Sequence, residues 1–143
     1  MADPLILTVP VFSDLGNLAL RLRREVFVAE QHVPAADELD AYDLTCTHVV
    51  AVLDGDVVGA LRIIFMPEHV KFGRVAVGRA ARGKGIATRM MHFAMDFARA
   101  RGETRFYLTA QTDKLALYEK LGFTAFGEEF QDGGMPHLAM KTY

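Results

Sequence analysis

A turn rich in glycine and basic residues is the feature that most limits how this chain can fold. It reads GRAARGKGIATRM, from Gly78 to Met90, and follows the β-prone run VKFGRVAV at positions 70–77. After the turn, at 100° per residue, apolar and polar side chains separate onto two sides of a helix. The apolar side comprises Ile86, Met90, Phe93, Ala94, Phe97 and Ala98, and the polar side comprises Thr88, Arg89, His92, Asp96 and Arg99. The pattern predicts a strand, a glycine turn and a surface helix that ends near Gly102.

The same stretch predicts an anion site. The first N–H groups of a helix have no partner within the helix, and the helix dipole favours negative charge at that end. Arg79, Arg82, Lys84 and Arg89 add positive charge, which favours a multiply charged phosphate. The alternative is a connecting turn with solvated basic side chains.

The glycine spacing discriminates among three phosphate ligands. Gly78, Gly83 and Lys84 fit the nucleoside-triphosphate pattern G-x-x-x-x-G-K-[ST], but Gly85 stands where that pattern needs a metal-binding hydroxyl. A dinucleotide loop requires a third glycine, which does not follow Gly85. The pyrophosphate of coenzyme A needs neither a metal ion nor a carboxylate partner for a ribose. It is the best match, and a degenerate nucleotide loop is the alternative.

Periodicity and turn signals predict the remaining elements. They are a strand at Leu5–Val9, a helix from Ser13 or Asp14 to about Ala29, a hairpin turning at Asp54-Gly55-Asp56, a strand at Arg105–Ala110, a helix from Thr112 to Gly122, and closing strands within residues 123–130 and 136–143. No repeat or linker interrupts this order in the sequence. We therefore expect one α+β or mixed α/β domain over residues 1–143.

Composition narrows the choice of partners. The 143 residues include 16 Lys and Arg against 18 Asp and Glu, so the chain lacks the basic excess typical of nucleic-acid binding. No apolar run approaches the roughly 20 residues that cross a bilayer, and the N-terminus lacks the basic flank of a signal peptide. The single cysteine, Cys46, cannot form an internal disulfide. We expect a cytoplasmic protein that binds neither nucleic acid nor membrane.

Two separate patterns resemble one protein family. Arg82-x-x-Gly85-x-Ala87 is similar to the [Q/R]-x-x-G-x-[G/A] signature of the GNAT superfamily of N-acetyltransferases. About 30 residues later, LALYEKLGF within 115–130 resembles the L-Y-x-K-x-G-F segment of that superfamily. The stretches at 23–43, 47–51 and 133–140 resemble a small bacterial branch of uncharacterised members.

The resemblance implies a fold and a cosubstrate. The fold would be a twisted, mostly antiparallel sheet of six to seven strands flanked by about four helices, with a splayed strand pair forming a cleft for acetyl-CoA. The backbone of Val75, Ala76 and Val77 would pair with the pantetheine arm, and Gln111 would contact the pantetheine or adenosine portion. The pyrophosphate would lie on the amides of Arg82, Gly83, Lys84, Gly85, Ile86, Ala87 and Thr88.

The resemblance also implies catalytic residues, with no metal ion. Tyr118 occupies the position of a general acid for the leaving thiolate, which a tyrosine with a pKa near 10 could protonate at neutral pH. Its alternative role is a core aromatic. The strand before the turn carries no Asp or Glu, so the base is open. The candidates are Glu30 and His137, with His48 and Glu68 behind them.

The implied reaction is acetyl transfer from acetyl-CoA to a primary amine of a small molecule or protein. The acidic residues Glu30, Asp37, Glu38, Asp40 and Asp43 could attract a cationic acceptor, or could form a solvated loop. A non-catalytic acyl-CoA-binding or regulatory domain is the alternative function. Exposed edge strands make a homodimer an open expectation.

Overall fold

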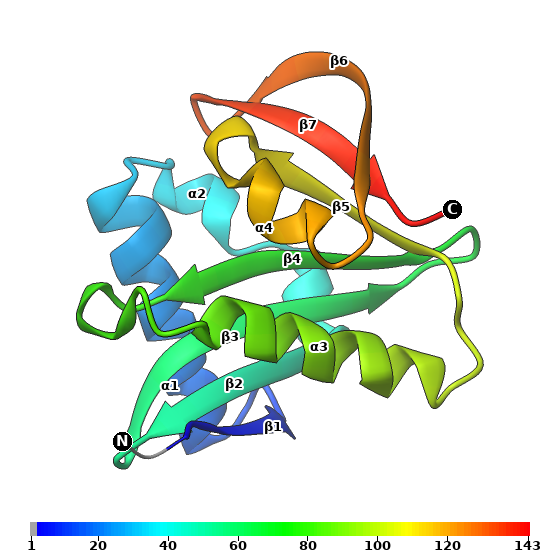
Figure 1. The fold of residues 1–143 in the computed structure, drawn as a ribbon. Helices are drawn as coiled ribbons and strands as arrows, with labels where there is room; N and C mark the ends of the chain where they lie inside the picture. The colour runs from blue at the N-terminus through cyan, green and yellow to red at the C-terminus, as the bar shows by residue number, and fades with distance from the viewer. Residues whose placement is uncertain (1–2) are drawn as a thin grey trace.

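Seven strands form one sheet in the order β1-β2-β3-β4-β5-β7-β6 (Figure 1). The computed structural model describes residues 3–143. The strands are β1 (Leu5–Val9), β2 (Thr47–Leu53), β3 (Asp56–Phe65), β4 (Val70–Val77), β5 (Phe106–Gln111), β6 (Thr124–Asp132) and β7 (Met135–Lys141). Neighbouring strands are antiparallel except β4 and β5, which are parallel. The predicted mixed fold with a mainly antiparallel sheet is confirmed.

Helical segments cover both faces of the sheet (Figure 1). They are α1 (Asp14–Arg23), the π-helical η1 (Arg24–Glu30), α2 (Ala35–Glu38), η2 (Ala41–Leu44), η3 (Arg79–Ala81), α3 (Ile86–Arg99), η4 (Thr112–Lys114) and α4 (Leu115–Glu119). The predicted first helix is therefore α1 continued by η1. Ser13 caps it, because its Oγ accepts a hydrogen bond of 3.0 Å from the N–H of Gly16. No described helix is long and apolar enough to cross a membrane.

Side-chain alternation along the strands divides the core into two layers. Leu61 and Ile63 of β3 face α3 and are almost fully buried, whereas Ala60 packs with the α1 residues Ala19 and Leu22. Because successive strand side chains point to opposite faces, Arg62 must point toward α1 rather than α3. The sequence therefore places a guanidinium group in the α1 layer of a buried sheet.

Helix α3 packs on the sheet through a wider stripe than the helical angle predicts. Ile86, Met90, Ala94 and Ala98 are buried as expected, and Phe93 and Phe97 are partly buried. Met91 and Met95 are also buried, although they lie beside the predicted stripe. A helix that lies across several twisted strands buries more than one narrow row of side chains.

Candidate functional site

Strands β4 and β5 separate soon after they meet. They pair only at Val70 with Phe106 and at Lys71 with Tyr107, and beyond these pairs they diverge (Figure 1). Within β4, Arg74 has a positive φ of 51° where the register with β3 shifts, so the strand bulges there. The divergence confirms the predicted splayed pair. It opens a cleft of about 590 Å³, a size typical of small-molecule sites.

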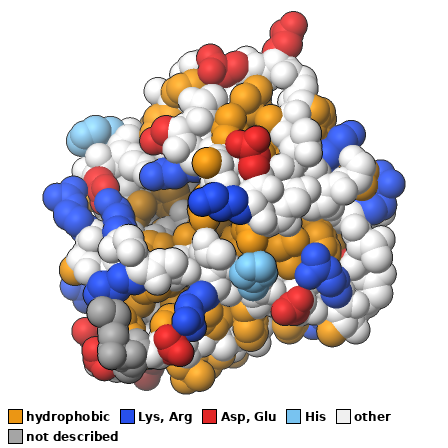
Figure 2. Space-filling model, viewed as in Figure 1, with side chains coloured by type: hydrophobic (Ala, Val, Ile, Leu, Met, Phe, Trp, Pro, Cys, Tyr) orange, Lys and Arg blue, Asp and Glu red, His pale blue; other side chains and the backbone are white. Residues whose placement is uncertain are grey.

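Many predicted site residues border this one cleft. Those that line it are Glu30, Val75, Ala76, Val77, Arg82, Ala87, Gln111, Tyr118 and His137. The others, Gly83, Lys84, Gly85, Ile86 and Thr88, form the turn and the first helical residues next to it. In Figure 2, Lys and Arg side chains gather around a hollow in which hydrophobic side chains are visible. The structure brings the predicted residues together but leaves their roles as predictions.

The glycine turn, residues 83–88, presents a row of free backbone donors. Within residues 3–143, none of the N–H groups from Gly83 to Thr88 donates a hydrogen bond. Gly83 and Gly85 have φ values of +78° and +76°, a conformation that side chains other than glycine rarely adopt. A Cβ atom added at either glycine would meet no atom within 4 Å, so open space lies beside the free amides. This geometry fits a phosphate group.

Arg82 contacts the protein rather than open space. Its Nη1 and Nη2 lie 2.6 and 2.8 Å from the Glu30 carboxylate, and its Nε donates to the Val77 carbonyl at 2.9 Å. These bonds occupy the guanidinium group and fix the turn against η1. Of the amides predicted to bind the pyrophosphate, that of Arg82 donates to the Arg79 carbonyl at 3.4 Å, whereas that of Ile86 is available although its side chain is buried in the α3 core.

The pairing with Arg82 disfavours Glu30 as a general base. The hydrogen bonds from Arg82, together with the charges of Arg82 and Arg79, lower the pKa of Glu30 despite some burial. A carboxylate stabilised in its charged form accepts a proton less readily. The pairing therefore makes Glu30 the weaker of the two candidate bases, and its catalytic role stays a prediction.

Tyr118 lies on α4 and is buried, with 8% of its surface exposed. Its ring packs edge-on against Phe123 with centroids 6.3 Å apart, and it also lines the cleft. Burial raises the pKa of Tyr118 to about 12, above the ordinary value assumed from the sequence. The phenol stays protonated across neutral pH, so it can donate a proton, although it is a weaker acid than expected.

Two further predicted residues border the cleft from different strands. Gln111, at the end of β5, donates from its amide to the Gln31 side chain at 3.0 Å. His137, on β7, donates from Nδ1 to the Met135 carbonyl at 2.9 Å and stacks on Phe130. Because Nδ1 carries the proton of a neutral ring in that bond, Nε2 is left as a lone-pair acceptor. His137 thus retains the chemistry that a base requires.

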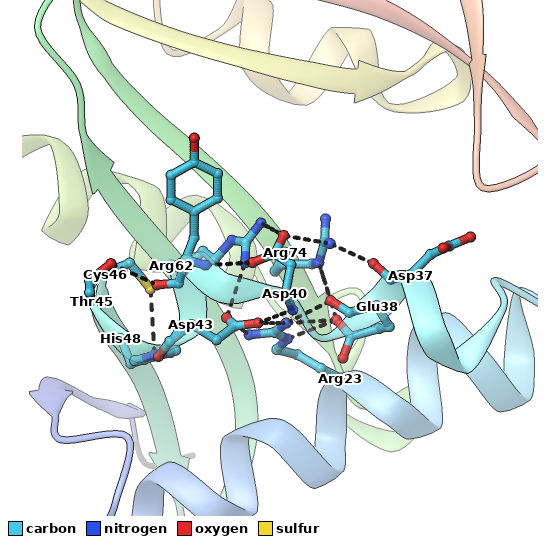
Figure 3. Close-up of polar contacts among 11 residues, drawn as sticks. Arg23, Asp37, Glu38, Asp40, Asp43, Thr45, Cys46, His48, Arg62 and Arg74 are labelled. Carbon is cyan, nitrogen blue, oxygen red and sulfur yellow. Dashed lines mark hydrogen bonds and ion pairs between the residues drawn. The ribbon is translucent and has the colours of Figure 1, made fainter.

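Three of the acidic side chains, Glu38, Asp40 and Asp43, are paired with arginines (Figure 3), whereas Asp37 is exposed and borders the cleft. Glu38 and Asp43 are buried, with 5% and 2% of their surfaces exposed. The arginine–carboxylate network joins Arg23 of α1, Arg62 of β3 and Arg74 of β4 to Glu38, Asp40 and Asp43. For Glu38, Asp40 and Asp43, both sequence interpretations are therefore corrected, whereas for Asp37 they stay open.

Short hydrogen bonds hold the network together. Arg23 donates from Nη1 to Asp43 at 2.7 Å and from Nε to Glu38 at 2.9 Å. Arg62 donates to both oxygens of Asp40, at 2.6 and 2.9 Å. Burial alone would raise the pKa of Asp43, but the hydrogen bonds from Arg23 and the Asp40 amide and the nearby arginine charges hold it well below its usual range. The Asp43 carboxylate is therefore ionised and compensated by arginines in the folded protein.

One cluster with metal-ligand side chains was not anticipated from the sequence. One ligand atom each of Asp43, Cys46 and His48 lies within 4.8 Å of the others. The oxygens of Asp43 already accept hydrogen bonds from Arg23 and Arg62, and His48 Nε2 donates to the Asp43 carbonyl at 2.8 Å. Burial raises the pKa of Cys46 to about 11, which keeps the thiol protonated. The cluster is therefore better described as an internal hydrogen-bonded group than as a set of free ligands.

Known proteins with related sequences and structures agree with this geometry. The protein-family model described as "Acetyltransferase (GNAT) family" matches residues 17–123 of the chain. The chain is 38% identical over 124 residues to the uncharacterized N-acetyltransferase YjcF of Bacillus subtilis, over 85% of this chain and 88% of that protein. An acyl-CoA N-acyltransferase from Pseudomonas aeruginosa superposes with a TM-score of 0.87 at 32% identity, covering 98% of this chain and 99% of that one. Escherichia coli ElaA superposes with a TM-score of 0.85 at 29% identity over the whole of both chains.

Proposed function

Because the chain belongs to the GNAT family of acetyltransferases, we propose that it transfers an acetyl group from acetyl-CoA to a primary amine. The observation that carries this proposal is the glycine turn at the end of the splayed strands, where six consecutive amides have no acceptor within residues 3–143 and open space lies beside Gly83 and Gly85. A coenzyme A pyrophosphate would accept hydrogen bonds from these amides, and the N-terminus of α3 would stabilise its charge. Lys84 would add a further positive charge.

Strand β4 would hold the pantetheine arm. The residues Val75, Ala76 and Val77 have no strand partner on their β5 side, so their backbone groups can bond to an extended molecule lying in the cleft. The chain of amide groups in pantetheine has donors and acceptors suited to such pairing. Gln111, on the opposite side of the cleft, would contact the same molecule after releasing Gln31.

Tyr118 and His137 would move the protons. As the amine nitrogen bonds to the acetyl carbon, the carbon–sulfur bond breaks and the thiolate takes the Tyr118 proton. His137 would take the proton that the amine loses, through Nε2 directly or through one water molecule. Acetyl-CoA supplies the activated acyl group, and no covalent enzyme intermediate is needed.

Binding and turnover test this function separately. Calorimetry should detect acetyl-CoA binding without added metal, and release of free thiol in the presence of a panel of amines should report transfer. A domain that only binds acyl-CoA would give the first signal without the second. Absence of acetyl-CoA binding, or tighter binding of magnesium-ATP, would contradict the proposal.

A further inference from the structure

A second group of cations lies in the cleft, apart from the glycine turn. Arg62 of β3 and Lys71 and Arg74 of β4 all line it. Arg62 is in register with Gly73, and Lys71 with Ile64, so both side chains project from the same face of the sheet as diagonal neighbours. This face is the α1 side, where the arginine–carboxylate network lies.

Gly73 leaves a gap between these cations. A Cβ atom added at Gly73 would meet no atom within 4 Å, and its φ is not positive. The backbone conformation at Gly73 does not require glycine. The main structural effect of the glycine is therefore the empty space that its missing side chain leaves. A small group could therefore lie beside Lys71 and Arg74 without displacing protein atoms.

The cationic side chains around the gap differ in whether they have a partner in the protein. In the network, the three guanidinium groups of Arg23, Arg62 and Arg74 are paired with three carboxylates. Among residues 3–143, the Lys71 ammonium has neither a hydrogen bond nor an ion pair. Arg62 Nε is buried and also lacks an acceptor in the described part of the chain. Within residues 3–143, Lys71 is thus a cation without a directly bonded partner, although the charge of Asp132 acts on it from a greater distance, and Arg62 Nε is a buried donor without an acceptor.

The pKa values of Lys71 and Arg74 are both shifted downward. Burial lowers the pKa of Lys71, and the charges of Arg62 and Arg74 lower it further, although Asp132 and Asp40 act in the opposite direction. The pKa of Arg74 is lowered by burial and by Arg62 and Arg23, against Glu38 and Asp40. A partly buried cation with no partner is costly, and an anion placed beside it relieves that cost.

We propose that Lys71, Arg74 and the gap at Gly73 form a subsite for a carboxylate of the acceptor, so that the acceptor is an amino acid or another amine that carries a carboxylate. This inference rests on the proposed acetyl transfer. One carboxylate would supply the direct partner that Lys71 lacks within the described chain and an acceptor for the buried Arg62 Nε. Asp37, Glu38 and Asp132 also border the cleft and repel any anion, but they repel a doubly charged phosphate more strongly than a singly charged carboxylate.

The test uses matched pairs of ligands that differ only in the carboxylate. Calorimetry on the CoA-saturated protein would compare N-acetyl amino acids, as product analogues, with their amides. We expect at least one acid to bind about tenfold or more tightly than its amide. Lys71→Met should remove this preference, Lys71→Arg should retain most of it, and the exposed Lys120→Met should leave it unchanged.

Turnover gives a second measurement. With free amino acids as acceptors, Lys71→Met should raise KM and change kcat little, whereas corresponding amino acid amides should react equally with both proteins. A peptide with an acidic side chain should be tested beside free amino acids. The better acceptor shows whether the carboxylate belongs to a free amino acid or to a peptide side chain.

Three outcomes would overturn the subsite while leaving acetyl-CoA binding intact. They are no preference for acids over amides, a preference that survives Lys71→Met, and acetylation of Lys71 itself detected by peptide mass spectrometry. Failure to bind acetyl-CoA would instead contradict the proposed function, so the two failures are distinguishable.

Discussion

The glycine turn and the arginine–carboxylate network border the same cleft but treat their polar groups in opposite ways. The turn leaves six backbone donors without partners, while the network joins nearly every donor and acceptor internally. Unsatisfied groups on a positioned backbone are available to a ligand, whereas satisfied buried charges fix the relative positions of α1, η2 and the sheet. A high density of charged side chains therefore does not by itself mark a binding site. Donors and acceptors without a partner in the protein are the better indicator.

The largest effect is expected for Tyr118→Phe, because Tyr118 combines a feature of the network with a feature of the turn. Tyr118 is buried like the network, but within residues 3–143 its hydroxyl has no hydrogen-bond partner, like the turn. If the phenol is the general acid, kcat should fall about 10²–10⁴-fold while the acetyl-CoA Kd and Tm stay near those of the wild type. Because its pKa is about 12, kcat should not fall from ionisation of Tyr118 between pH 7 and 10. A change in kcat of under about threefold, less than 1 kcal/mol of barrier, would remove Tyr118 from the mechanism.

Arg23→Met should break the network. The substitution leaves the buried Glu38 and Asp43 carboxylates without their main partner, so the free energy of unfolding should fall by about 3–5 kcal/mol. The matched control on the same helix is Arg21→Met, since Arg21 forms only an exposed pair with Glu25 at 3.5 Å and should contribute about 0.5 kcal/mol or less. Urea denaturation measures both. Equal effects would contradict the structural role assigned to the network.

Gly85→Asp should affect the turn without unfolding the protein. The side chain would enter the open space beside the free amides and add negative charge, so the Kd for acetyl-CoA should rise about 100-fold or more, or about 2.7 kcal/mol. Gly102→Asp is the control, because Gly102 has a similar φ of +85° with open space around it but follows the other end of α3. Calorimetry should show weakened binding for the first variant alone. Equal losses would attribute the effect to backbone strain.

Acid should weaken the network more gradually. The pKa of Asp43 in the folded protein lies below its unfolded value of about 4, so its stabilisation is complete above pH 4 and is lost as the pH falls toward the folded value. Asp43 should contribute on the order of 1 kcal/mol to the stability lost by pH 3.5. Unfolding by urea between pH 7 and 3.5 measures the slope, and Asp43→Asn should reduce it. An unchanged slope in that variant would exclude Asp43 as a source of acid sensitivity.

Local patterns made the turn predictable, whereas long-range pairing concealed the network. The spacing of Gly83, Gly85 and the apolar stripe of α3 is local, so sequence alone predicted strand, turn and helix. The partners of Arg62 lie 19 and 22 residues away, in a short irregular segment whose path depends on packing against α1. The alternation of Leu61, Arg62 and Ile63 could have indicated a charge in the α1 layer, but not which carboxylates meet it.

The pairing of Glu30 with Arg82 was hidden for a similar reason. The two residues are 52 positions apart, and η1 carries Glu30 to the turn only after α1 has packed on the sheet. Met91 and Met95 were missed because their burial depends on the strands that lie beneath α3. In each case the missing information was the relative placement of elements rather than the elements themselves.

The position of the splayed strands also affects the tendency of this protein to aggregate. Unpaired strand edges are a template for aggregation when they lie on the perimeter of a molecule. Here the open edges of β4 and β5 lie inside the sheet, in a cleft lined by η1 and α4 residues such as Glu30 and Tyr118. A strand from a second chain carries bulky side chains on both faces and is a poor fit for such a gap, whereas a slender, unbranched molecule is not. The fold thus encloses its unpaired backbone groups in a cleft instead of leaving them on the perimeter of the sheet.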